Sequence, residues 1–344
     1  MRVALLPPNI YTIPPRGYGG EIMVWDLACG LAELGVEVEL FGIAGSQCPP
    51  KGRLHYMPQF PLELFLLGER AVWHFSKHIL DECDVVHSWS HSGYVHNSIH
   101  FYGRGNSLQT LWGTLIPAHF LRRNLCGWSQ FHRQIMIQQG APETTRFVHG
   151  GCDTQKYCPD SEHPYEKDGF LFLSRMYPSK RVEVFLSLAK RFPNERFVLS
   201  GSFGKVGTPD HAYYGNIYRQ YAEKLSNDVI EADVSEERKI QLFRSARAVI
   251  FPSLAEAFGL ILVEALSCAC PVIASRDGSF PELIREGETG FLAASLQDFE
   301  KAIRNVDALE PKRCREDAVK RWDRSRVAAD YLKVYKDIAN NEFF

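Results

Sequence analysis

Two glutamates, Glu256 and Glu264, directly follow a buried apolar run and stand eight residues apart. On one helix they would be separated by about 12 Å and about 80° of rotation, too far to hold one small group but suited to the two ends of an elongated ligand. Gly259 lies between them, and a helix beginning there would direct N–H groups and its positive dipole end at an anion. This pattern predicts a phosphate site, the alternative being two ordinary surface carboxylates.

A second group of charged residues, Arg175, Lys180 and Arg181, follows another apolar run. Arginine offers a planar fork to phosphate oxygens and lysine a mobile point charge, so together they suit a diphosphate. A solvated basic turn is the alternative, but the carboxyl ends of strands are where α/β sheets bind ligands. The glycine pair Gly19 and Gly20 opens the first predicted helix and is a weaker signal, because such a pair is often only a turn.

The elements that position these residues alternate between short apolar runs and helical patterns, which predicts an α/β class with parallel sheets and crossover helices. A helix with one apolar stripe closes the sequence from residue 327 onward. The second half repeats the organisation of the first. The predicted strands are 3–6, 36–41 and 84–87 in the first half, and 169–173, 196–199, 248–251 and 271–274 in the second.

The chain has 344 residues, enough for two domains with cores of their own. A polar segment with Pro159 and Pro164 separates the halves and has the composition of an interdomain linker. The boundary is therefore expected near residue 160.

Composition excludes several classes of partner. The 39 Lys and Arg balance 41 Asp and Glu to a net charge of −2, so no global field gathers nucleic acid. Nine scattered cysteines without a C-x-x-C pair argue against zinc or redox chemistry. No leader-like or membrane-spanning run is evident, so a cytoplasmic location is expected. Apolar stretches at 60–67 and 120–123 leave a peripheral membrane contact open.

These motifs resemble the retaining glycosyltransferases of the GT-B fold, specifically family four, the glycogen-synthase-like and mannosyltransferase-like group. The strongest likeness is residues 251–265, FPSLAEAFGLILVEA, which is similar to the family's E-x7-E frame. Residues 271–274 and 281–291 also resemble the family. The S-R and P-S-K of 174–180 are similar to the family's G-R…P-E-K loop. Gly19–Gly20 resembles its glycine loop, and 147–153 resembles its I-P-N-G-V-D linker.

The resemblance implies two Rossmann-like domains facing each other across a cleft. Residues 1–160 would form the acceptor-side domain, with 317–344 crossing back onto it, and 161–316 the nucleotide-sugar domain. By the resemblance, Glu256 is the catalytic residue at the donor sugar and Glu264 binds the ribose hydroxyls. The remaining donor-binding residues would be two cations, the helix-start amides and the glycine loop: Arg175, Lys180, Phe258, Gly259, Leu260, Gly19 and Gly20.

The implied reaction moves a sugar from a nucleoside-diphosphate sugar to a hydroxyl acceptor, a glycan, small molecule or lipid-linked compound, with retention of anomeric configuration. No D-x-D occurs in the sequence, so we expect no metal and no cofactor beyond this co-substrate. Trp112 stands where many relatives carry a histidine, and His87 and His91 are candidates to compensate.

Three alternatives remain open at this stage. A nucleotide-sugar epimerase of similar architecture would convert the donor without an acceptor. A non-catalytic nucleotide-sugar-binding protein would bind the donor and leave it unchanged. An NAD-dependent dehydrogenase also has Rossmann-like halves, but the chain lacks G-x-G-x-x-G after its first strand.

Overall fold

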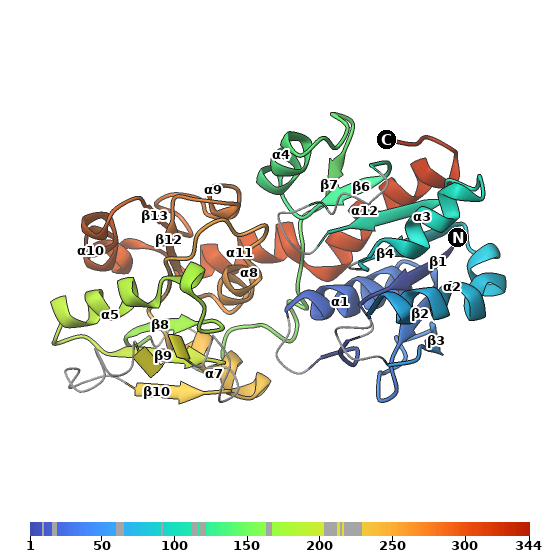
Figure 1. Cartoon of the computed structure of the whole chain (residues 1–344). Helices are drawn as coiled ribbons and strands as arrows, with labels where there is room; N and C mark the ends of the chain where they lie inside the picture. Colours follow the sequence, from blue (N-terminus) through green and yellow to red (C-terminus); the bar gives the residue numbers. More distant parts are fainter. Residues whose placement is uncertain are drawn as a thin grey trace. The chain divides into compact units, whose positions relative to one another are not determined.

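The computed structural model consists of two compact units (Figure 1). Unit 1 comprises Met1–Asp153 and Trp322–Phe344, and unit 2 comprises Thr154–Arg321. The structure describes residues 1–8, 10–15, 19–59, 65–90, 92–111, 116, 122–162, 167–202, 212–213, 215–216 and 229–344.

The first boundary falls at residue 153 rather than near 160, because the residues that follow are already held by unit 2. Arg315 donates hydrogen bonds from Nη1 to the carbonyl oxygens of Thr154 at 2.7 Å and Tyr157 at 2.8 Å. The second boundary falls at 321 rather than 316, since Arg321 Nη1 donates to the carbonyl oxygen of Leu283 at 3.3 Å.

Unit 1 is a seven-stranded parallel sheet in the order β3-β2-β1-β4-β5-β6-β7. Its strands are β1 (Arg2–Leu6), β2 (Glu37–Gly42), β3 (Arg53–Tyr56), β4 (Val85–Ser88), β5 (Ser107–Thr110), β6 (Leu125–Gly127) and β7 (Arg146–Phe147). Its helices are α1 (Gly19–Glu33), α2 (Phe65–Asp81), α3 (Tyr94–Phe101), α4 (Gln130–Gln138) and α12 (Arg324–Ala339).

The last helix, α12, packs closely against α1 within unit 1 (Figure 1). Gly30 permits the contact, because a Cβ atom there would lie 2.5 Å from the carbonyl oxygen of Arg324 and 2.9 Å from Cβ of Ala328. The apolar stripe of α12 is buried, as its spacing predicts: Val327, Tyr331, Val334, Tyr335 and Ile338.

Unit 2 is a six-stranded parallel sheet in the order β10-β9-β8-β11-β12-β13. Its strands are β8 (Phe170–Leu173), β9 (Phe197–Gly201), β10 (Val229–Ala232), β11 (Ala248–Phe251), β12 (Val272–Ser275) and β13 (Gly290–Ala293). Its helices are α5 (Val182–Arg191), α7 (Glu236–Ser245), α8 (Leu260–Ser267), α9 (Phe280–Leu283), α10 (Leu296–Asn305) and α11 (Pro311–Trp322), with 3₁₀ turns η2 (Pro178–Lys180) and η4 (Val306–Ala308).

The strand order of unit 2 determines where a ligand fits. From β8 the chain adds β9 and β10 on one side and then returns to place β11 on the other side. The strand order therefore reverses between β8 and β11, and open α/β sheets bind ligands at the carboxyl ends of the strands at such a point. The aromatic core under this edge includes Phe172, whose ring centroid lies 5.6 Å from that of Phe185 on α5.

None of the helices in the described ranges has both the length and the apolar character that a bilayer crossing requires. Residues 60–64 and 117–121, which overlap the two apolar stretches noted in the sequence, lie outside the described residues.

Candidate functional site

The loops that follow β8 and β11 join into one site at the carboxyl edge of unit 2. Leu254 donates its backbone N–H to the carbonyl oxygen of Ser179 at 3.0 Å. Ser253 donates its hydroxyl to the same carbonyl at 3.2 Å. Because strands β8 and β11 are neighbours, two segments more than seventy residues apart in sequence present their polar side chains together.

Glu256 and Lys180 form an ion pair in this site. Oε1 of Glu256 also accepts a hydrogen bond from the hydroxyl of Ser253. The lysine ammonium lies 5.6 Å from the ring centroid of Phe251, the last residue of β11. The sequence predicted both residues for the site but not their pairing, which places a carboxylate beside the cation that would face a diphosphate.

Arg175 is the second residue after β8, and its side chain is exposed. Within the part of the chain that the structure describes, it makes no hydrogen bond or ion pair, unlike Lys180. An exposed guanidinium at the carboxyl edge of the sheet is available to an anionic ligand, since its fork of donors is suited to phosphate oxygens.

The loop after β12 supports the backbone around Glu256. Ala255 adopts a left-handed φ of 54° and donates its N–H to Oδ1 of Asp277 at 2.5 Å. Ser279 donates its N–H to the carbonyl oxygen of Glu256 at 3.0 Å. Asp277 and Gly278 are not among the residues predicted for the site, although Asp-Gly after a strand is a turn signal.

Replacing Gly278 with alanine is expected to disturb the site while leaving the fold intact. A Cβ atom at Gly278 would lie 2.8 Å from the backbone nitrogen of Glu256 and 2.9 Å from its carbonyl oxygen, and φ is already +59°. We expect Gly278→Ala to weaken nucleotide binding about tenfold, because the Glu256 loop must move. Titration calorimetry measures the change, and Gly287→Ala is the control.

The control glycine isolates crowding from backbone strain. Gly287 has a φ of +74°, and a Cβ atom added there would meet nothing within 4 Å among the described residues. Both variants carry a left-handed alanine, but only Gly278→Ala meets Glu256. Equal nucleotide affinity in the two variants would contradict the supporting role assigned to the loop after β12.

The helix that carries the second glutamate, α8, begins at Leu260, one residue after Gly259. A Cβ atom at Gly259 would lie 2.9 Å from Cε1 of Phe280, so glycine allows the chain to pass close to α9. Phe258 is buried and Leu260 is partly exposed. The sequence predicted a helix starting at this point, and the structure has it there.

Glu264 is almost fully buried, with 1% of its surface exposed. Both of its carboxylate oxygens contact the ammonium of Lys239, at 3.1 and 3.2 Å. Burial raises the pKa of the Glu264 carboxyl above its ordinary value, whereas Lys239 opposes this shift. Glu264 is therefore not a helix-surface carboxylate, and no pattern in the sequence indicated its lysine partner.

The remaining predicted residues lie elsewhere. Gly19 and Gly20 are the first residues of α1, in unit 1. Trp112 and His91 lie outside the described residues. His87 is fully buried in unit 1, where Nδ1 pairs with the hydroxyl of Tyr335 at 2.6 Å and Nε2 with that of Thr110 at 2.8 Å.

The His87 ring has a packing role. Both ring nitrogens are already engaged, and burial lowers the pKa of His87 well below its ordinary value. It is held neutral among Trp89, which directly follows β4, and Tyr331 and Tyr335 of α12. The alternative that His87 compensates for a missing catalytic histidine is therefore wrong.

No cluster of three or more histidine, cysteine or acidic side chains suited to a metal ion occurs among the described residues. All nine cysteines are free thiols, most of them buried.

Solved structures share the fold over the whole chain. A glycosyltransferase of avilamycin A biosynthesis, AviGT4, has a TM-score of 0.78 at 23% identity, covering 100% of this chain and 99% of its own. Sucrose-phosphate synthase from Thermosynechococcus elongatus has a TM-score of 0.79 at 16% identity, covering 99% and 100%. Anabaena HepE in complex with UDP-glucose has a TM-score of 0.72 at 16% identity, covering 98% and 100%. The chain therefore has the GT-B fold, which confirms the fold predicted from the sequence.

A family model matches the half of the chain that holds the site, and curated relatives match about half of the chain. The model described as "Glycosyl transferases group 1" matches residues 153–321, which span unit 2. D-inositol 3-phosphate glycosyltransferase from Mycolicibacterium paratuberculosis is 31% identical over 176 residues. The Mycobacterium tuberculosis (strain H37Ra) protein of the same name is 30% identical over 179 residues. These matches cover 46% and 47% of this chain but only 38% and 35% of the relatives.

Proposed function

We propose that this protein is a glycosyltransferase that moves a sugar from a nucleoside-diphosphate sugar to a hydroxyl acceptor with retention of anomeric configuration. The observation that carries the proposal is the site of unit 2. There, the loops after β8 and β11 join and pair Lys180 with Glu256, which precedes the helix that holds Glu264, and Arg175 lies exposed in the same loop as Lys180. The family match covers the same residues and favours transfer over the epimerase, dehydrogenase and non-catalytic alternatives.

The ends of the donor are assigned by charge. Arg175 and Lys180, with the amides of Phe258, Gly259 and Leu260, would hold the diphosphate, because cations and a helix start both favour a phosphate. Glu264 would accept hydrogen bonds from the ribose hydroxyls. Glu256 would face the sugar hydroxyls, and a donor-binding role of Gly19 and Gly20 stays a prediction from the sequence.

In the proposed reaction, the bond between the sugar C1 and the diphosphate oxygen breaks and a bond from C1 to the acceptor oxygen forms on the same face. The proton of the acceptor hydroxyl passes to the departing phosphate oxygen. Negative charge grows on the leaving diphosphate, so its stabilisation is the main catalytic task. We propose that the positive charges of Arg175 and Lys180 stabilise this negative charge without a metal ion.

The names of similar proteins guide the choice of nucleotide and bear on the acceptor. HepE has been crystallised with UDP and with UDP-glucose, so UDP is the first nucleotide to test. The curated relatives carry a glycosyltransferase name with an inositol phosphate acceptor, whereas the acceptor of this chain is proposed only as a hydroxyl compound.

Thermal unfolding with UDP, ADP and GDP tests the proposal. A ligand at 100 times its Kd stabilises the folded state by about 2.7 kcal/mol, which raises the Tm of a unit this size by roughly 5–11 °C. We expect at least one nucleotide to do so, and Glu264→Ala to abolish the rise. A wild-type Tm that none of the three nucleotides moves would refute the proposed donor.

Product analysis then separates the enzymatic alternatives. Incubation of the matching nucleotide sugar with a panel of hydroxyl acceptors should release the nucleoside diphosphate and form a glycoside. Conversion of the donor sugar without any acceptor would indicate an epimerase. Binding without either reaction would indicate a non-catalytic protein.

A further inference from the structure

Glu264 belongs to a buried charged cluster, which we call the Lys239 cluster: Lys156, Tyr157, Glu236, Lys239 and Glu264. The Lys239 ammonium is central, lying 3.1 and 3.2 Å from the two oxygens of Glu264 and 3.0 Å from Oε1 of Glu236. It also lies 4.9 Å from the ring centroid of Tyr157. One lysine therefore contacts two carboxylates and an aromatic face in the interior of unit 2.

The two lysines of the cluster differ in what they contact. Lys156 is 41% exposed and lies 3.2 Å from Oε1 of Glu236. Tyr157 donates its hydroxyl to the same carboxylate. Lys239 is only 14% exposed, and among the described residues it is the one cation in an ion pair with Glu264. Within this cluster the charge of Glu264 is thus balanced by Lys239, whereas Glu236 has several partners.

Lys239 counteracts two effects that disfavour the ionised form of Glu264. Burial raises the pKa of the Glu264 carboxyl, and the negative charge of Glu236 raises it further. The other titratable groups that face it are Tyr157, beside both carboxylates, and the thiol of Cys268, which directly follows α8. A hydrogen bond from Tyr157 also lowers the pKa of Glu264, but neither group supplies a positive charge, so Lys239 provides the largest opposing effect.

The ionisation state of Glu264 decides what it can bind. A vicinal diol presents two O–H donors, and an ionised carboxylate accepts both because each oxygen has a free lone pair. A protonated carboxyl carries a donor of its own and offers a weaker pair of acceptors. Lys239 contacts both oxygens, which fixes the plane of the carboxylate and leaves lone pairs for a ligand.

We propose that Lys239 is a positioning residue that holds Glu264 ionised and oriented to accept both ribose hydroxyls, and thereby sets the preference of the site for ribonucleotides over 2′-deoxyribonucleotides. This inference rests on the proposed function, because it takes a nucleoside diphosphate as the ligand.

The test measures the affinities of UDP and 2′-deoxy-UDP for the wild type, Lys239→Met and Lys156→Met. If ADP or GDP binds more tightly than UDP, that nucleotide and its 2′-deoxy form are used instead. Because a hydrogen bond to a charged group adds affinity, the wild-type protein should bind the ribonucleotide about tenfold or more tightly than the 2′-deoxyribonucleotide, and this ratio of affinities is the quantity compared. We expect Lys239→Met to reduce this ratio toward one, because UDP loses the hydrogen bonds of two hydroxyls to the ionised carboxylate whereas 2′-deoxy-UDP loses that of the 3′-hydroxyl only. Lys156→Met removes the same charge from the same cluster without touching Glu264, so its ratio should match the wild type.

The dependence of UDP affinity on pH gives a second readout. Protonation of Glu264 removes an acceptor, so affinity should fall as the pH falls through the pKa of that carboxyl. Loss of Lys239 raises this pKa further, and the fall in affinity should therefore occur at higher pH in Lys239→Met than in the wild type. Lys239→Arg retains the charge and should restore both the ratio and the pH profile.

The outcomes separate this inference from the proposed function. If the wild type binds none of the nucleotides, both are overturned. If the wild type prefers the ribonucleotide and Lys239→Met keeps the same preference and pH profile, the inference is overturned and the proposed function stands. If Lys239→Met does not fold, Glu236→Gln decides: removing the competing carboxylate should move the fall in UDP affinity to lower pH, and an unchanged profile would overturn the inference.

Discussion

Replacing Arg175 and Lys180 together with alanine is expected to weaken nucleoside diphosphate binding by about 100-fold to 10,000-fold. Each residue would donate charged hydrogen bonds to the diphosphate, and such a bond contributes about 1.5–3 kcal/mol. Two of them amount to about 3–6 kcal/mol, at 1.4 kcal/mol for each factor of ten. The double variant also leaves Glu256 without its lysine partner, which adds repulsion against an incoming anion.

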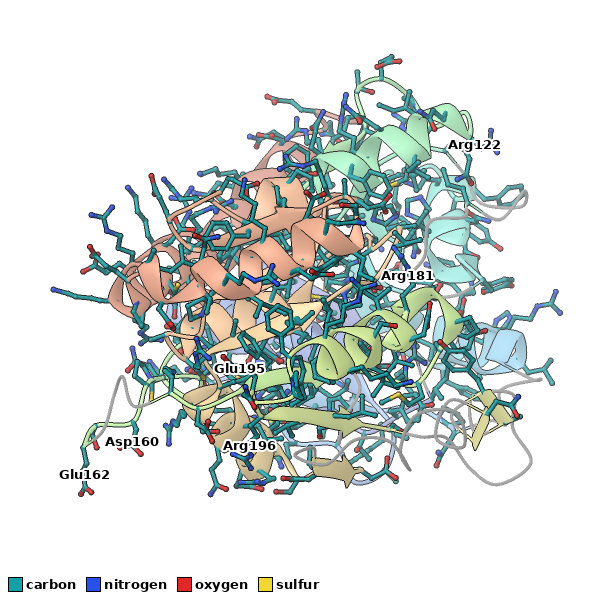
Figure 2. The ribbon with its side chains drawn as sticks, turned by 90° about the vertical axis from the view of Figure 1, so that its left-hand side faces the viewer. Arg122, Asp160, Glu162, Arg181, Glu195 and Arg196 are labelled. Atoms are coloured by element: carbon teal, nitrogen blue, oxygen red, sulfur yellow. The ribbon has the colours of Figure 1, made fainter. Side chains whose placement is uncertain are left out.

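The measurement is titration calorimetry with UDP, ADP and GDP, and the control removes two cations from elsewhere in unit 2. Arg196, half-buried, precedes β9 and Lys312, exposed, lies on α11, and each forms an ordinary ion pair with an exposed carboxylate. Figure 2 shows Arg196 well apart from Arg181, which precedes α5 beside the site. Arg196→Ala with Lys312→Ala should retain wild-type affinity. If both double variants bind alike, the two cations do not hold the diphosphate.

The turnover of the Arg175 and Lys180 double variant should fall further than its affinity for the product nucleotide. Charge grows on the diphosphate as the sugar departs, so interactions with the two cations strengthen in the transition state. Comparison of kcat/KM with the nucleotide Kd measures this difference.

Much of unit 2 could be predicted from the sequence because its central strands are continuous apolar runs. The expected strand 248–251 coincides with β11, and 271–274 differs from β12 by one residue. A parallel strand covered on both faces produces such a run, which identifies it without tertiary information. In unit 1, by contrast, the edge strand β3 has the sequence RLHY and none of its residues is fully buried. It therefore lacks the apolar pattern, and the sequence does not predict it.

The candidate site was predictable residue by residue, but its partnerships were not. The positions of Arg175 and Glu256 after apolar runs place each at a strand end. That the loops after these two strands join depends on β8 and β11 being neighbours, and strand order is a long-range property. Lys239 lies on α7, and no spacing in the sequence relates it to Glu264 on α8. Burial of a glutamate on a helix likewise depends on which elements cover that helix.

The unit boundary shows the same limit. Pro159, Pro164 and polar neighbours mark a linker by composition, yet the preceding residues already belong to unit 2. Hydrogen bonds from Arg315 to Thr154 and Tyr157 determine the boundary. Composition reports where a chain is polar, whereas the boundary depends on contacts with residues more than 150 positions away.

Gly201→Ala is expected to destabilise unit 2 by about 2–6 kcal/mol. A Cβ atom at this last residue of β9 would overlap the carbonyl oxygen of Ser174 and lie 2.7 Å from its carbonyl carbon and 2.9 Å from its nitrogen. The contacts are with backbone, so no side chain can rotate away. Crowding and the positive φ of 137° each add about 1–3 kcal/mol.

This loss should lower the Tm of unit 2 by roughly 5–20 °C, which a thermal unfolding scan measures. Ser174 leads directly into Arg175, so any relief of the overlap by a shift of the β8 end must also move the guanidinium proposed to bind the diphosphate. Nucleotide affinity should therefore fall even in molecules that remain folded. Gly287→Ala has a positive φ without crowding and bounds the contribution of backbone strain alone. A Tm for Gly201→Ala equal to that of Gly287→Ala would mean that β8 and β9 do not approach each other at Ser174, and the geometry assigned to Arg175 would have to be abandoned.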